Sequence, residues 1–306
     1  AYAFLKEIWK PINKGVVGVS FDIWDYNFSA NSYKDRFTSE WAHPLRPFAK
    51  EWSRILQMAE GINTTPFHNE RGYGSVFFSL ASRIETYLES DFRGSGVELE
   101  QIGLLAADID CDKAGQDIGE ALAKLLTFEP KPSIIVNSGG GVHVYWLLSE
   151  ALNVPTLRDI GDYRLHSKTM CDKLQNFLGY EVDSGVSEAT RILRLPGFRN
   201  CKVSRKRAAC YILYWSPETR YTVEQLWQHF PAKQEYGMEV EHELLVGEVA
   251  QRPADVARHR DDLAAQERLV AVAVRRAHRR EHLRRRHLLV EPLVGGVARA
   301  RPDQAV

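Results

Sequence analysis

The chain has 306 residues, of which 44% are hydrophobic and 10% aromatic, a composition typical of a globular protein with one large domain or two. Its 40 Lys and Arg residues balance 40 Asp and Glu residues, so overall charge gives no support to nucleic-acid binding, and any such surface must be a local patch. The sequence has no run of eighteen apolar residues and no visible signal peptide, which predicts a cytoplasmic protein without a membrane span.

Residues 1–70 are expected to form an α/β subregion. Residues 16–24 have the apolar composition of a strand, and apolar residues recur on one helical stripe from about 47 to 60. Aromatic side chains are dense in residues 1–45, where core packing is favoured over the stacking of bases.

The central prediction concerns residues 103–110, where an apolar run ends in Asp108 and Asp110. On a strand, side chains two positions apart project from the same face, so both carboxylates would leave the end of a buried strand together. Carboxylates that close repel each other, and a cation that prefers oxygen ligands, Mg²⁺ or Mn²⁺, removes the repulsion. Two solvated acids where the strand meets its loop remain the alternative.

A hairpin-like loop is predicted between residues 133–137 and 142–148, which both have strand composition. The loop consists of Ser138, Gly139, Gly140 and Gly141. Glycines let the backbone approach a bulky anion, and successive N–H groups can form an anion-binding nest. Ser138 and His143 would add a hydroxyl and an imidazole at its two ends. A flexible turn with a partly buried histidine is the alternative.

An amphipathic helix is expected at residues 113–128 and a long helix at residues 155–178, and Thr222-Val-Glu-Gln225 predicts a capping box that opens a third. Further strands are expected within residues 72–82, 191–195 and 208–215.

A third polar group follows the second of these helices. Asp183 can supply another carboxylate, while Arg194, Arg199 and Lys202 form a basic cluster around a Pro-Gly turn that suits phosphates. Arg191 and Arg194 lie three positions apart, so on a strand at most one would face the site directly. Solvated surface charge is the alternative for each basic residue.

In this order, the motifs resemble the archaeo-eukaryotic primase superfamily, and most of all the primase-polymerase domains of plasmids, phages and other mobile genetic elements. The resemblance rests on Asp-x-Asp, then Ser-Gly-Gly-Gly-x-His, then an Asp before Arg-x-Leu-Arg-Leu-Pro-Gly-x-x-Asn-x-Lys, and spans about residues 70–215. It implies an α+β fold in which residues 71–235 form a catalytic core, a mostly antiparallel sheet of RNA-recognition-motif type backed by helices. Phe198 departs from the pattern, because relatives often have a small hydroxyl residue there.

The resemblance implies a DNA primase or polymerase, a nucleotidyltransferase that makes primers on single-stranded DNA from nucleoside triphosphates with Mg²⁺ or Mn²⁺. Asp108, Asp110 and Asp183 match the catalytic, metal-binding acids, and Glu188 is a rival for the third position. The residues expected at the nucleotide are Ser138, Gly139, Gly140, Gly141, His143, Arg194 and Lys202. No Gly-x-x-x-x-Gly-Lys-Ser/Thr loop occurs, so a replicative helicase would act in trans.

Two other functions remain open, a non-catalytic single-stranded-DNA-binding module for replication initiation and a metal-dependent nuclease. Residues 236–306 differ from the rest in composition, with no Lys, Ile, Phe, Trp, Ser, Thr, Asn or Cys. This segment is interpreted either as a disordered or helical basic tail or as a non-native reading of a GC-rich gene. No catalytic role is expected for it.

Overall fold

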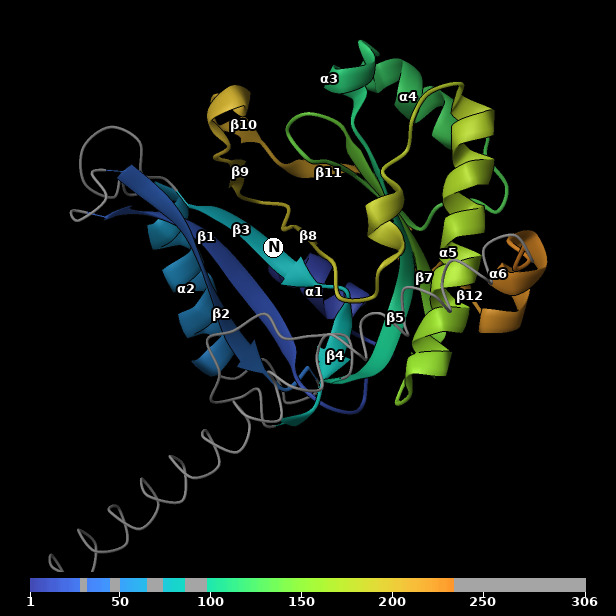
Figure 1. Cartoon of the computed structure of the whole chain (residues 1–306), viewed down its shortest axis with the longest axis horizontal. Helices are drawn as coiled ribbons and strands as arrows, with labels where there is room; N and C mark the ends of the chain where they lie inside the picture. The colour runs from blue at the N-terminus through green and yellow to red at the C-terminus, as the bar shows by residue number, and fades with distance from the viewer. Residues whose placement is uncertain (28–31, 45–49, 65–73, 86–97, 234–306) are drawn as a thin grey trace, which may run out of the picture. The chain divides into compact units, whose positions relative to one another are not determined.

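The computed structural model describes residues 1–27, 32–44, 50–64, 74–85 and 98–233. All of them belong to one compact unit, Ala1–Leu244. In this unit two main sheets and the helices beside them pack around one large apolar core (Figure 1). The predicted tail at 236–306 lies outside the described residues. No helix in the described part of the chain is long and apolar enough to cross a membrane.

The larger sheet has six strands in the order β11-β6-β7-β5-β4, with β12 beside β7. Its strands are β4 (Ala81–Arg83), β5 (Leu99–Ile109), β6 (Ile134–Asn137), β7 (Val142–Asn153), β11 (Tyr211–Trp215) and β12 (Arg220–Tyr221). All neighbours pair antiparallel except β12, which is parallel to β7. The expected α+β fold with a mostly antiparallel sheet is therefore confirmed.

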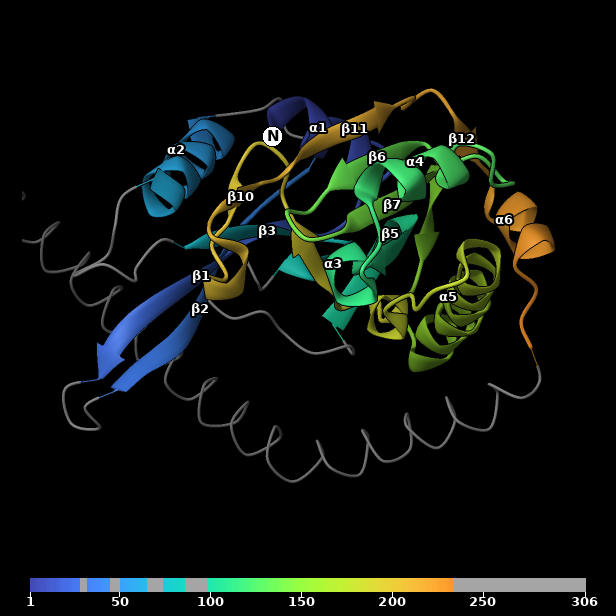
Figure 2. The same cartoon turned by 90° about the horizontal axis from the view of Figure 1, so that it is seen from above.

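This sheet is covered on both faces, which explains why its central strands are apolar almost throughout. Tyr145 and Trp146 are successive residues of β7, so they point to opposite faces, and both are fully buried. Tyr145 packs against Phe4 of α1 (Tyr2–Ile8), while Trp146 packs against Phe128 and Phe230. Figure 2 shows the long helix α5 (Leu157–Leu178) on the side of the sheet opposite α1.

The smaller sheet has four antiparallel strands in the order β2-β1-β3-β8. They are β1 (Val17–Asn27), β2 (Ser32–Ala42), β3 (Ser75–Ser79) and β8 (Ile192–Arg194). This sheet takes strands from both sides of residue 70, where the sequence analysis places the edge of a subregion. Only the buried residue Leu80 separates β3 from β4, so the chain passes directly from one sheet to the other.

The remaining helices and strands lie outside the two sheets. They are α2 (Lys50–Thr64), α3 (Cys111–Ala114), α4 (Ile118–Leu125), α6 (Val223–His229), η3 (Ser184–Ser187), η4 (Val203–Arg205), β9 (Arg199–Asn200) and β10 (Ala208–Ala209). The single helix expected at 113–128 is two helices, because Gly115 ends α3 with a φ of 66° and Asp117 caps α4. The capping box between Thr222 and Gln225 is confirmed.

Candidate active site

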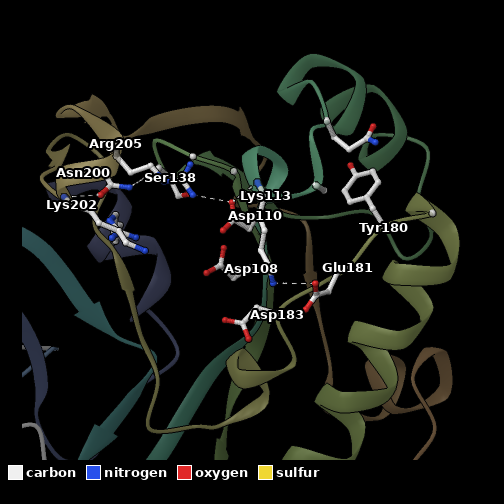
Figure 3. Close-up of a pocket in the computed structure, with 16 residues that line it drawn as sticks. Asp108, Asp110, Lys113, Ser138, Tyr180, Glu181, Asp183, Asn200, Lys202 and Arg205 are labelled. Atoms are coloured by element: carbon white, nitrogen blue, oxygen red, sulfur yellow. Dashed lines mark hydrogen bonds and ion pairs between the residues drawn. The ribbon is translucent and has the colours of Figure 1, made fainter.

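A cavity of about 660 Å³ lies at the end of β5, within the size range of small-molecule sites (Figure 3). Its charged lining residues are Asp108, Asp110, Glu181, Asp183, Lys113, Arg194, Lys202 and Arg205. Carboxylates and cationic side chains therefore share one polar space. Such a space suits a ligand that is itself a polyanion accompanied by cations.

Eight of the ten predicted site residues line this cavity. They are Asp108, Asp110, Asp183, Ser138, Gly140, Gly141, Arg194 and Lys202. The other two, Gly139 and His143, do not line it. Segments separated by as much as 94 positions along the chain therefore meet at one place.

Asp108 is one of two residues of β5 that are partly exposed, whereas the others are buried. Its backbone oxygen accepts a hydrogen bond of 2.9 Å from the N–H of Asp183, which places the two carboxylates side by side. Burial, and then the charge of Asp183, raise the pKa of Asp108 to about 6, against the opposing effect of Arg194 and Arg191. The carboxylate that Asp108 faces most directly is thus Asp183.

Asp110 reaches the cavity in a different way from the one predicted. Strand β5 ends at Ile109, and Asp110 is the N-cap of α3, with φ −83° and ψ 82°. Its carboxylate accepts hydrogen bonds from the Lys113 N–H (3.2 Å) and from Arg205 Nη2 (3.0 Å). The prediction that Asp108 and Asp110 share one face of a strand was therefore wrong, because the chain turns into a helix between them.

Asp183 is held from two sides as the N-cap of η3. Its Oδ1 accepts from the Gly185 N–H at 2.8 Å, and its Oδ2 accepts from Arg191 Nη2 at 2.9 Å. The rival Glu188 lies 3.7 Å from Arg164 Nη2 and does not line the cavity. Of the two acids, the structure brings Asp183 to the site.

Both arginines of the Arg-x-Leu-Arg run act on the site. Arg194 ends β8, lines the cavity and lies with its guanidinium carbon 5.2 Å from the centre of the Phe77 ring. Arg191 precedes β8, so strand alternation does not apply to it, and it pairs with Asp183. Both lower the pKa of Asp108. Only Arg194 lines the cavity, as expected if at most one of the two faces the site directly, and Arg191 acts there through its pair with Asp183.

The glycine loop connects β6 to β7 directly over the end of β5. Inside the loop, the Ser138 N–H donates to the Gly141 carbonyl at 3.0 Å, and the Gly139 N–H donates to Asn137 Oδ1 at 2.8 Å. Within the described part of the chain, no hydrogen bond engages the N–H groups of Gly140 and Gly141, which both line the cavity. If the loop binds an anion, these two N–H groups are the ones left to donate to it.

His143 lies behind Asp108 and away from the cavity. Its ring is 1% exposed, with Nε2 3.6 Å from Asp108 Oδ1 and Nδ1 3.1 Å from the Tyr145 hydroxyl. Burial, and then the nearby charge of Arg194, lower the pKa of His143 to about 3, so the ring is neutral. The buried ring therefore lies against Asp108 and does not reach the cavity, where the sequence predicted that it would bind the nucleotide.

Arg205 is the principal site residue that the sequence analysis does not assign. Its side chain is 17% exposed and pairs with the carboxylates of Asp110 and Asp112. Its guanidinium also lies over the glycine loop, because a Cβ on Gly140 would come within 2.5 Å of Arg205 Cζ. The basic residues around Arg205 were the only sequence feature that pointed to a role for it. Composition does not reveal that its partner would be Asp110, which lies 95 positions away.

The opposite wall of the cavity was also not assigned. Lys113 Nζ pairs with Glu181 Oε2 at 3.1 Å, and Tyr180 lies beside them (Figure 3).

Asn200, within the Arg-Leu-Pro-Gly-x-x-Asn-x-Lys run, donates from Nδ2 to the Ser138 carbonyl at 3.1 Å. This bond connects the basic run to the glycine loop.

The donor set suits a hard divalent cation, because three carboxylates converge on one polar cavity. As the side chains stand, Arg205 and Arg191 pair with two of these acids. Among the residues that the structure describes, no group of three or more His, Cys, Asp or Glu side chains is already arranged around one ion position. The adjacent pair Asp108 and Asp183 is the part of the set that best fits Mg²⁺ or Mn²⁺.

Comparisons with known proteins give a distant likeness among solved structures. No protein-family profile and no curated protein sequence matches the chain. Among solved structures, the chain is similar to the polymerase domain of Mycobacterium tuberculosis ligase D in complex with DNA, with 12% sequence identity and a TM-score of 0.32. The likeness covers 74% of this chain and 86% of that one. At such a TM-score it carries no weight for function, which we infer from the cavity itself.

Proposed function

We propose that the chain is a DNA primase or polymerase that joins nucleotides from nucleoside triphosphates on a single-stranded DNA template. The observation that supports this proposal is the meeting, in one cavity, of three carboxylates from distant segments with a glycine loop and a basic wall. Carboxylates that bind divalent cations and basic groups that bind phosphates are the two requirements of phosphoryl transfer.

The basic wall and the glycine loop would hold the triphosphate. Arg194 offers a planar guanidinium and Lys202 a point charge, and both are suited to phosphate oxygens. The N–H groups of Gly140 and Gly141 add two uncharged donors. As the 3′-oxygen forms its bond to the α-phosphorus, the bond to the bridging oxygen breaks, and these groups neutralise the charge of the departing pyrophosphate.

The acidic side of the cavity would hold Mg²⁺ or Mn²⁺ through Asp108 and Asp183, with Asp110 nearby. When bound, such ions neutralise phosphate charge and lower the pKa of the attacking hydroxyl. The chain keeps the two acids in place by different means. Neutral His143 supports Asp108 from behind, and Arg191 orients Asp183.

The test is nucleotide incorporation on single-stranded DNA by the full chain with Mg²⁺ or Mn²⁺, with and without a primer. Asp108→Asn and Asp183→Asn keep side-chain size but remove charge, and each should lower the rate by about a hundredfold or more. Asp162→Asn is a matched control, because Asp162 is exposed on α5 outside the cavity. Undiminished incorporation by the Asp108 variant would contradict the metal-binding role.

One observation favours a second function, a non-catalytic module that binds single-stranded DNA. Arg205 and Arg191 occupy the carboxylates of Asp110 and Asp183, as in a structural ion-pair network. Such a module would bind DNA without metal and incorporate no nucleotide. Incubation of labelled DNA with metal but without nucleotides tests the remaining alternative, a nuclease, through the appearance of cleavage products.

A further inference from the structure

A basic hairpin, residues 199–209, lies beside the cavity. It consists of β9, η4 and β10, and it contains no acidic residue (Figure 1). Its basic residues are Arg199, Lys202, Arg205, Lys206 and Arg207. This density of positive charge contrasts with a chain whose overall charge is zero.

The hairpin is fixed to the body of the protein at its base. The side chain of Asn63, on α2, accepts from the Arg199 N–H at 2.8 Å and donates to the Arg199 carbonyl at 3.0 Å. The hydroxyl of Ser75, on β3, accepts from the Cys201 N–H at 3.0 Å. Bonds from two separate elements therefore preorganise the hairpin, which reduces the conformational entropy lost when it binds a partner.

The tip of the hairpin has a strained backbone. Lys206 and Arg207 have φ values of 48° and 61°, in the left-handed region that residues with side chains rarely adopt. Arg199 Nη1 donates to the Arg207 carbonyl at 3.1 Å, and Arg207 Nη2 donates to the Asn63 carbonyl at 2.9 Å, so these contacts hold the turn. Strained backbone that its surroundings enforce is often found at ligand clamps.

The positive charges of the hairpin divide into two groups. Arg205 turns inward and is neutralised by Asp110 and Asp112. The exposed basic residues are Arg199, Lys202 and Lys206, and no carboxylate in the part of the chain that the structure describes pairs with them. These three outward charges, named here the outer face, are available to an anionic partner, and Lys202 connects them to the rim of the cavity.

We propose that the outer face of the basic hairpin binds the phosphodiester backbone of a single-stranded nucleic acid that enters the cavity. The proposal rests on the proposed function, for which the strand is the template. A row of lysine and arginine charges follows a phosphate backbone without reading its sequence. Tyr211, two residues beyond the hairpin, is 49% exposed, and its ring offers a surface on which an unpaired base can stack.

The test is binding of the full chain to fluorescent oligothymidylate, measured by anisotropy over a range of salt concentrations. Arg199→Ala/Lys206→Ala removes two phosphate contacts, each of which accounts for about 0.7 of the log–log salt slope on a single strand. The slope should fall by about 1.4, and affinity at 0.1 M salt should fall by about 25-fold. Because Arg199 also holds the hairpin turn, Lys206→Ala alone provides a second measurement, with an expected loss of about fivefold.

The matched control is Lys131→Ala/Arg158→Ala, which removes one lysine and one arginine that are exposed outside the hairpin and the cavity. Its affinity and salt slope should equal those of the parent. Equal slopes for the hairpin variant and this control would overturn the proposal. An equal loss of affinity for a duplex of the same length would overturn the assignment to a single strand.

Two further measurements separate this inference from the proposed function. Binding of a fluorescent nucleoside triphosphate should be unchanged in Lys206→Ala. If this variant lost as much affinity for the nucleotide as for oligothymidylate, the hairpin would be a nucleotide site and the proposal would be overturned. If the parent incorporates no nucleotide but the hairpin variant loses strand binding, the proposed function fails and the strand site stands.

Discussion

Asp108 and His143 are register partners on neighbouring strands, and the imidazole Nε2 lies 3.6 Å from the carboxylate. This distance is too long for a hydrogen bond. The environment acts on the two groups in opposite directions, because burial disfavours the charged form of each. The pKa of Asp108 is raised to about 6, while that of His143 is lowered to about 3.

The first prediction concerns stability in acid. Below pH 6.5 the unfolded chain protonates His143 while the folded chain does not, so the free energy of unfolding falls by about 1.4 kcal/mol per pH unit down to about pH 3. Asp108 acts in the opposite direction between about pH 6 and 3.8, because there the folded chain binds the proton more tightly. The two contributions offset each other in that window.

Asp108→Asn removes the contribution of Asp108 to this pH dependence and leaves that of His143. Between pH 6 and 4, its free energy of unfolding should fall by about 1.4 kcal/mol per unit more steeply than that of the parent. Urea denaturation at half-unit pH intervals measures the difference, and Asp162→Asn should follow the parent. Parallel profiles for Asp108→Asn and the parent would show that the carboxylate does not titrate as the geometry implies.

The second prediction separates neighbouring glycines of the loop. A Cβ on Gly141 would lie 2.0 Å from the Ile109 carbonyl oxygen. Because a backbone atom cannot move aside as a side chain can, Gly141→Ala should lower the free energy of unfolding by about 3 kcal/mol. The three atoms nearest to a Cβ on Gly140 all belong to the side chain of Arg205, which can move, so Gly140→Ala should cost less. Chemical denaturation measures both variants.

Gly61 provides the control for these substitutions. Nothing lies within 4 Å of a Cβ at this position of α2, so Gly61→Ala should raise the free energy of unfolding by about 0.5–1 kcal/mol. If Gly141→Ala were as stable as Gly140→Ala, the loop would not lie against the end of β5 as described.

The third prediction concerns Arg205. Its partners Asp110 and Asp112 have side chains that are 43% and 54% exposed, so solvent screens the pairs, and Arg205→Ala should cost only about 1 kcal/mol of unfolding free energy. Arg205→Lys should not recover the loss fully, because one ammonium cannot reproduce a planar guanidinium that pairs with two carboxylates. Thermal and urea unfolding measure the series. Arg158→Ala, at an exposed position, should leave stability unchanged, and full recovery by lysine would show that charge alone matters.

Local patterns in the sequence predict the parts of the site that depend on neighbouring residues. An apolar run that ends in an acid places Asp108 at the end of β5, and the glycines between two strands predict the loop. The change from strand to helix before Asp110 was missed, because it depends on the contact of its carboxylate with the Lys113 N–H. Strand β2 was also missed, since its polar residues show no clear alternation and it is defined by pairing with β1.

Contacts between distant segments are what the sequence alone does not reveal. Arg205 bonds Asp110 across 95 positions, and Asn63 bonds Arg199 across 136. The residues next to Arg205 or Asn63 in the sequence do not indicate which distant acid or backbone group each side chain will contact. These contacts depend on how the two sheets and α2 pack, which is decided by the apolar core as a whole.

The last prediction tests whether Asn63 sets the position of the basic hairpin. Asn63 is 3% exposed, and its Nδ2, which bonds the Arg199 carbonyl, also donates a hydrogen bond of 2.8 Å to the Gly74 carbonyl. Asn63→Ala leaves buried polar groups without partners and should lower the free energy of unfolding by about 2–3 kcal/mol. The control Gln57→Ala, at an exposed position of α2, should change this free energy little. Because Asn63 carries no charge, any loss of oligothymidylate affinity in the folded variant reflects displaced hairpin charges. Reduced stability with unaltered affinity would show that the hairpin keeps its place without this side chain.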